Sequence, residues 1–185
     1  MNLRKGSKNW AFEPFLWFAL IVGLIAYFVN VLNTHDWLWF QQKSEMLRPG
    51  RIIIVDRGQR TTIVPGHEDF ERLAEAVGLS VSRPSNSDLI NVGISEETVA
   101  FYKEAGVMLE IYFDRPVTFH TAYRAGEPTQ ILLPISGRHA GKGYFFRGAQ
   151  GEWWFGAMRM ADPMPIYRLM AEMGYNVDMP VSEAP

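Results

Sequence analysis

The longest apolar stretch of the chain lies near its N-terminus, where residues 15–32 have the sequence FLWFALIVGLIAYFVNVL. Sixteen of these 18 residues are apolar, and the two exceptions are Gly23 and Asn30. As a helix the stretch would be about 27 Å long, close to the thickness of the hydrocarbon core of a bilayer. The pattern predicts a transmembrane anchor helix over residues 14–33, with the lipid bilayer contacted by residues 15–32.

Two other interpretations of this stretch are weaker. A buried core helix would rarely lack a polar face over this length. A cleaved signal peptide would have a shorter apolar region and a cleavage site between small residues. The segment that follows, from Asn33 to Trp37, offers no such site. We therefore expect an uncleaved signal anchor.

Tryptophans flank the predicted span on both sides. Trp10 and Trp17 lie at one end, and Trp37 and Trp39 lie at the other. Because the indole ring prefers the headgroup level of a bilayer, these four residues are predicted to be membrane-interface residues.

The distribution of basic residues predicts the orientation of the span. Arg4, Lys5 and Lys8 precede it, whereas the first basic residue after it is Lys43. The positive-inside rule then makes residues 1–13 a cytoplasmic tail and places the remaining mass outside the cytoplasm. The predicted location is the cell membrane, with a single pass and an extracytoplasmic C-terminal domain.

Residues 34–50 form a predicted juxtamembrane connector. They contain no Gly or Pro before Pro49, so the membrane helix could continue through the connector until Pro49 and Gly50 end it. The globular domain is then expected over residues 51–185.

The domain shows helical periodicity in three places and strand patterns in seven. The first helical pattern runs from Phe70 to Gly78. The second follows the predicted N-cap Ser95 and ends at Gly106, and the third follows the predicted N-cap Asp162 and ends at Gly174. The strand patterns cover residues 51–56, 61–64, 107–113, 117–123, 130–135, 143–147 and 152–157. Helices before and after a run of strands predict an α+β domain with a mainly antiparallel sheet and about three short helices.

One predicted hairpin brings together the most reactive pair of side chains. If residues 107–113 pair with residues 117–123, Ile111 lies opposite Phe119 and Glu110 lies opposite His120. The same register puts Val107, Leu109, Ile111 and Phe113 on the buried face. A carboxylate beside an imidazole suits a general base, so His120 and Glu110 are the candidate catalytic residues of a hydrolase-type enzyme. An exposed cross-strand contact is the ordinary alternative.

A basic, glycine-rich loop is the second candidate. Arg138, His139 and Lys142 lie within it, and Arg147 follows just beyond. The loop does not match a phosphate-binding loop, because the spacing differs and a strand pattern follows instead of a helix. These four residues could bind a small anion, and a solvated hairpin connection is the alternative.

Two aromatic triplets form the third candidate. Residues 144–146 and 153–155 are the arms of one predicted hairpin. Since adjacent strand residues point to opposite faces, either both faces of the sheet are covered or some of the rings are exposed. Exposed rings would favour a protein interface, so the candidate interaction residues are Phe145, Trp153, Trp154 and Phe155.

Composition narrows the function. The chain has 185 residues, a net charge of −2 and no cysteine, which argues against a nucleic-acid role and excludes disulfides and thiolate metal sites. The four histidines lack metal spacing, and neither a metal nor another cofactor is expected. The sequence favours a membrane-anchored accessory or interaction subunit that docks a membrane or envelope complex through a protein partner. A hydrolase and an anion-binding module remain the alternatives.

Overall fold

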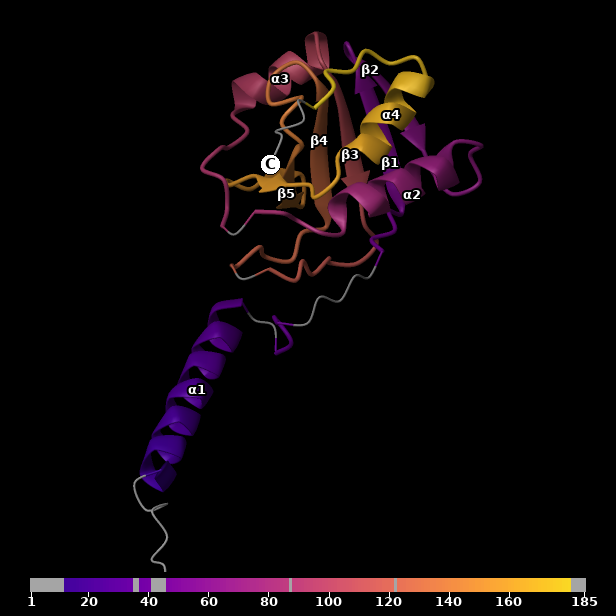
Figure 1. Ribbon diagram of the computed structural model, residues 1–185. Helices are drawn as coiled ribbons and strands as arrows, with labels where there is room; N and C mark the ends of the chain where they lie inside the picture. The colour runs from indigo at the N-terminus through magenta and orange to yellow at the C-terminus, as the bar shows by residue number, and fades with distance from the viewer. Residues whose placement is uncertain (1–11, 35–36, 41–45, 87, 122, 181–185) are drawn as a thin grey trace, which may run out of the picture.

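The computed structural model describes residues 12–34, 37–40, 46–86, 88–121 and 123–180. A long helix, α1 (Phe12–Thr34), extends from a domain built around one antiparallel sheet (Figure 1). The domain strands are β1 (Arg51–Asp56), β2 (Gln59–Ile63), β3 (Val107–Tyr112), β4 (Gln130–Ser136), β5 (Tyr144–Ala149), β6 (Glu152–Trp153) and β7 (Met158–Arg159). The domain helices are α2 (Phe70–Val81), α3 (Glu96–Glu104) and α4 (Met164–Glu172). The predicted α+β class is confirmed.

The sheet has the strand order β2-β1-β3-β4-β5-β6, and β7 pairs with the other end of β5. All of these pairs are antiparallel, and the central strand β3 places Leu109 between Ile54 and Leu133. The tight turn between β1 and β2 uses Arg57 and Gly58, whose φ angles of 44° and 85° match the turn that two-residue hairpins prefer.

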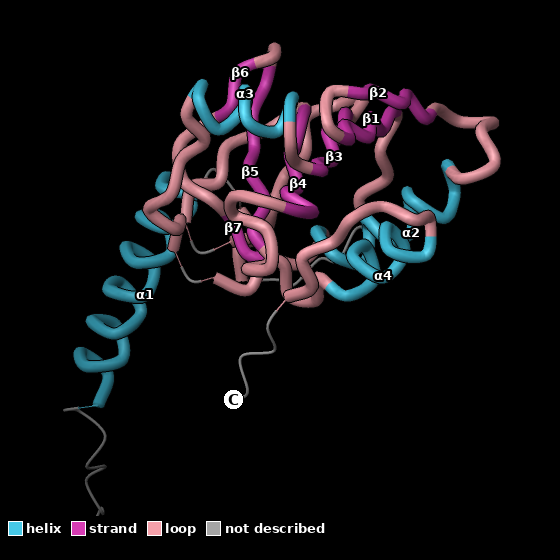
Figure 2. The backbone as a smooth tube through the Cα atoms, turned by 90° about the horizontal axis from the view of Figure 1, so that it is seen from above, coloured by secondary structure: helices cyan, strands magenta, loops and turns pink. Residues whose placement is uncertain are grey.

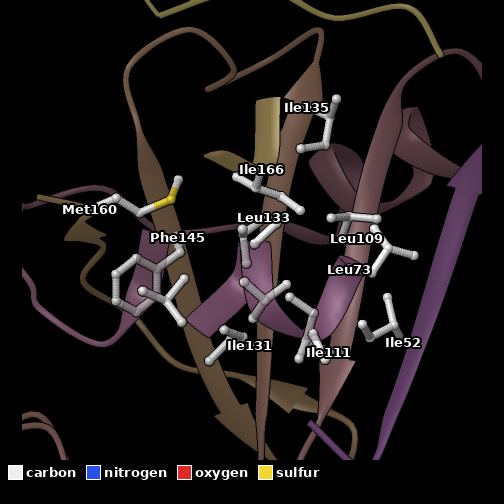
Figure 3. Close-up of a cluster of buried hydrophobic side chains, with 14 of the residues drawn as sticks. Ile52, Leu73, Leu109, Ile111, Ile131, Leu133, Ile135, Phe145, Met160 and Ile166 are labelled. Carbon is white, nitrogen blue, oxygen red and sulfur yellow. The ribbon is translucent and has the colours of Figure 1, made fainter. Parts of the chain in front are cut away.

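Both faces of the sheet are buried. On the first face, α2 and α4 pack over β1, β3 and β4 (Figure 2); Figure 3 shows Leu73 of α2 and Ile166 of α4 over side chains such as Leu109 and Leu133. On the second face, Tyr102 of α3 packs with side chains that alternate with those of the first: Ile53, Val55, Met108, Leu132 and Phe146. Consecutive strand residues are therefore buried in opposite directions.

An irregular segment, described over residues 113–121 and 123–129, completes the cover of the first face. Its residues Phe113, Val117, Phe119, Tyr123 and Ala125 belong to the same buried cluster as the residues of α2 and α4. In Figure 1 this segment crosses the end of the domain that is nearest to α1.

The predicted hairpin between residues 107–113 and 117–123 is wrong. Both edges of β3 are occupied by β1 and β4, so Glu110 lies opposite Ile53 and Leu132 instead of His120. The described part of residues 117–123 forms no strand. It packs its alternate apolar residues against the sheet face, which explains why the pattern resembled a strand.

The start of α3 agrees with the prediction, and the start of α4 falls one residue later. The Ser95 hydroxyl accepts a hydrogen bond from the Thr98 amide (3.2 Å), and the Asp162 carboxylate accepts one from the Met164 amide (3.0 Å). Gly78, in contrast, does not end α2, which continues to Val81. A Cβ atom at Gly78 would lie 2.7 Å from Cγ of Met46, so this glycine lets the connector cross the helix closely.

The helix α1 does not continue through the connector. It ends at Thr34, and residues 37–40 form a turn. The Thr34 hydroxyl donates to the carbonyl of Asn30 (2.8 Å), and the Tyr27 hydroxyl donates to the carbonyl of Trp37 (2.9 Å). The second bond ties Trp37 of the turn to the last part of the helix.

Two substitutions in α2 test the assignment of its buried face. Leu73 is fully buried, whereas 52% of Leu79 is exposed. We expect Leu73→Ala to lower the free energy of unfolding by about 2–5 kcal/mol, because it leaves a cavity under the helix. Leu79→Ala should change it by less than about 0.5 kcal/mol. Urea unfolding of the full chain in mild detergent, followed by tryptophan fluorescence, measures both, and equal losses would contradict the packing of α2.

Candidate functional site

The exposed surface of α1 is the first functional feature of the structure. The helix has 23 residues and a length of about 34 Å. Of the residues in its most apolar 18-residue stretch, 6% are buried. Trp17 lies on it and is 64% exposed, and Trp10 lies outside the described residues. By length and composition, α1 is a candidate membrane span.

The polar side chain inside this helix is satisfied locally. The Asn30 side-chain amide donates a hydrogen bond to the carbonyl of Ala26 (2.9 Å), one turn earlier. This bond lowers the cost of placing an amide in or near hydrocarbon.

Aromatic side chains gather at the domain end of α1. This aromatic collar consists of Tyr27, Phe28, Trp37, Trp39 and Phe40, whose neighbouring ring centroids lie 5.5–6.4 Å apart. Trp37 and Phe40 are 63% and 57% exposed. Amphipathic rings at one end of an apolar helix are typical of a membrane–water interface.

A cavity of about 740 Å³ lies between the end of α1 and the domain. We call it the membrane-proximal cavity. The last residue of α1, Thr34, and Trp37 of the following turn contribute to its wall. The domain contributes the polar and aromatic side chains Thr118, Arg124, Glu127 and Trp154.

Arg147 of β5 holds the domain side of this cavity together. The residue is 5% exposed, and its guanidinium donates to the carbonyls of Ala125, Phe155 and Gly156, the last at 2.8 Å. The guanidinium also lies 5.7 Å from the ring centroid of Trp154. Burial lowers the pKa of Arg147 from its ordinary value, against an opposing contribution from nearby Tyr123. These bonds join residues 123–126 to residues 154–156, and both segments contribute to the cavity wall.

The four predicted interaction residues lie in different environments. Phe145 is buried on the first face, and Trp153 is partly buried against the second. Trp154 is half-buried at the cavity, and Phe155 is 68% exposed and packs against Gly93. The predicted strand over residues 152–157 is interrupted after Trp153, and this break turns Phe155 outward.

The structure does not bring Glu110 and His120 together. Glu110 is buried, where its carboxylate lies 2.6 Å from Nη2 of Arg60 and accepts a hydrogen bond from the Tyr112 hydroxyl (2.9 Å). The Glu110 bond raises the pKa of Arg60, and burial raises the pKa of Tyr112. His120 lies in the irregular segment and lines another cavity, of about 410 Å³, whose wall does not include Glu110.

The four residues predicted to bind an anion make different contacts in the structure. Arg138 donates to Glu97 (3.0 Å) and lies over the ring of Phe101. His139 packs against Phe146, and burial, followed by the charges of Lys142 and Arg138, lowers its pKa. Lys142 lines a further cavity, of about 650 Å³. The guanidinium of Arg147 donates its hydrogen bonds to backbone carbonyls.

Sequence reasoning missed Arg124 and Glu127. They flank Gly126, whose positive φ of 75° and close approach to the Trp154 ring fix the loop at the cavity. In the sequence, the only indication of a site was the pair of opposite charges beside a glycine in a long loop. The proximity of these charges to α1 depends on the fold. Among the described residues, no group of three or more His, Cys, Asp or Glu side chains is placed to hold a metal ion.

No family model matches the chain, and no curated protein matches it in sequence. The fold is similar to the crystal structure of YycH from Bacillus subtilis, with a TM-score of 0.50 and 14% sequence identity. The similarity covers 74% of this chain and 40% of YycH, so the chain spans less than half the length of that protein. At this level of identity, the likeness shows a shared fold alone.

The role of Arg147 can be tested against a second arginine. We expect Arg147→Met to lower the free energy of unfolding by about 2–4 kcal/mol, because it leaves buried carbonyls without donors. Arg138→Met, which removes an exposed ion pair, should cost less than about 1 kcal/mol. Urea titration of the full chain in detergent measures both, and a loss at Arg147 no larger than that at Arg138 would contradict the assigned role.

Proposed function

We propose that this chain is a single-pass membrane protein that acts as an accessory or interaction subunit of a membrane or envelope complex, with its α+β domain outside the cytoplasm. The observation that carries the proposal is the exposed apolar surface of α1. A helix of this length with apolar side chains on every side needs a hydrocarbon environment.

The packing of the domain supports this interpretation of α1. The sheet is covered on both faces by α2, α4, α3 and the irregular segment, so the core of the domain does not use α1. Val31 is the one α1 residue among those buried in the described structure. The helix is therefore available to lipid along almost its whole length.

An interaction role agrees better with the side-chain contacts than a hydrolase does. The proposed catalytic pair is separated, because Arg60 and Tyr112 hold Glu110 on the sheet. The hydroxyl of Ser82, in the cavity that His120 lines, accepts from the Leu47 amide (3.1 Å) and bonds to the carbonyl of Gly78. Glu110 and Ser82 therefore make bonds that stabilise the fold, whereas Phe155 presents an apolar ring to solvent.

The orientation follows from the basic residues of the N-terminal tail. Arg4, Lys5 and Lys8 favour the cytoplasmic side, and no basic residue balances them before Lys43.

Because the chain has no cysteine, single-cysteine variants report its topology directly. We expect Glu75→Cys, on the exposed face of α2, to react with a membrane-impermeant maleimide on intact cells. Ser7→Cys should react only after permeabilisation. Alkaline carbonate should leave the full-length chain in the membrane pellet. The reverse labelling pattern would contradict the orientation, and release or N-terminal cleavage of the chain would contradict the anchor.

The interaction role predicts a stoichiometric partner after extraction in mild detergent. Phe155→Ala should lower the amount of that partner about tenfold, since an exposed aromatic ring at an interface contributes more than about 1.4 kcal/mol. Leu79→Ala removes an exposed apolar side chain from α2 and should leave the partner bound. Purification of the wild-type chain as a partner-free monomer would count against the role.

A further inference from the structure

The membrane-proximal cavity has one basic and one acidic side chain in its wall. Arg124 and Glu127 both lie in the exposed part of the loop, on either side of Gly126. Within the described parts of the chain, neither side chain forms an ion pair. Two unpaired charges of opposite sign in one concave site suit a ligand that itself has both charges.

The cavity also contains aromatic and hydroxyl groups. Trp37 and Trp154 contribute indole rings from its two sides, and Thr34 and Thr118 contribute side chains with hydroxyl groups. An indole face attracts ammonium groups, and a guanidinium matches a phosphate through paired hydrogen bonds. The volume of about 740 Å³ lies within the range of small-ligand sites.

The position of the cavity selects the kind of ligand. It lies where α1 ends and beside the aromatic collar, so it is at the headgroup level when α1 spans a bilayer. This step rests on the membrane anchoring proposed above. The ligands at highest local concentration there are phospholipid headgroups.

We infer that the membrane-proximal cavity binds the headgroup of a zwitterionic phospholipid, phosphatidylethanolamine. Arg124 binds the phosphate, and Glu127 accepts hydrogen bonds from the ammonium, which also lies against the tryptophan rings. An anionic headgroup such as phosphatidylglycerol fits less well, because it supplies no cation for Glu127. Arg147 acts at a distance, as a positioning residue that keeps residues 123–126 and Trp154 together.

Lipid retention by the full chain tests the inference. The chain is purified in mild detergent, mixed with equal amounts of phosphatidylethanolamine, phosphatidylcholine and phosphatidylglycerol, and weighed by native mass spectrometry. We expect phosphatidylethanolamine to be retained in preference to phosphatidylglycerol. Arg124→Gln should lower its retention about tenfold, as expected for loss of one charge-assisted contact.

Glu127→Gln gives a sharper result, because it should change the preference and not only the affinity. Without the carboxylate, retention of phosphatidylglycerol should rise relative to phosphatidylethanolamine. Arg168→Gln and Glu75→Gln, which remove exposed charges from α4 and α2, are the matched controls and should behave as the wild type. Unchanged near-ultraviolet circular dichroism verifies that the variants are folded.

Soluble probes separate a headgroup site from a simple anion site. Free phosphoethanolamine should displace the lipid, and inorganic phosphate at the same concentration should not. Equal displacement by phosphate, preferred retention of phosphatidylglycerol by the wild type, or unchanged retention in both cavity variants would overturn the inference. So would variants that keep the lipid but lose a co-purifying protein, since the cavity would then be a protein-docking site. A chain that stays in carbonate-washed membranes yet retains no lipid refutes this inference alone, whereas a chain released by carbonate refutes the anchor.

Discussion

Strands β1, β3 and β4 have apolar side chains on both faces, so the sheet needs a cover on each side. Helices α2 and α4 supply most of one cover, and α3 with the residues before it supplies the other. The two helices on the first face have 12 and 9 residues, or about 18 and 14 Å. They leave one end of that face to residues 113–121 and 123–129, which cross it as a strap with alternate apolar side chains buried and no strand of its own.

This strap explains the presence of a buried arginine in β5. An irregular segment pairs only some of its carbonyls with its own amides, and buried carbonyls without donors are costly. The donors of Arg147 serve Ala125 on the strap and Phe155 and Gly156 across from it. Arg147 thus links one carbonyl of the strap to residues 155 and 156, in addition to backbone bonds such as that from the Val117 amide to the Pro128 carbonyl. Arg124 and Glu127 lie on the exposed side of the strap.

Much of the architecture could be predicted from local patterns, because local physics determines it. The exposed apolar run of α1 and the cap at Ser95 depend on residues next to one another. The alternation from Val117 to Tyr123 also identified the buried side correctly. It could not identify the pairing. A period of two shows which side chains are buried, but it does not show that both edges of β3 are already paired with β1 and β4.

The remaining features depend on contacts between distant parts of the chain. Gly78 allows Met46 of the connector to approach α2 closely. The sequence pattern around it indicates only that a glycine often ends a helix. The membrane-proximal cavity combines residues near position 35 with residues near position 125. Arg124 and Glu127 are ordinary loop charges until the fold places them beside Thr34 and Trp37.

The connector that begins where α1 ends at Thr34 also limits how far the domain can travel. Met46 lies 12 residues after Thr34, so even a fully extended chain between them would span at most about 43 Å, and the turn at residues 37–40 shortens that reach. Under the proposed anchoring, the domain searches a thin layer beside the bilayer instead of the whole compartment. Its effective concentration for a partner in the same membrane is then high, in the range that short tethers produce. A contact too weak to hold a freely diffusing domain becomes sufficient for a tethered one.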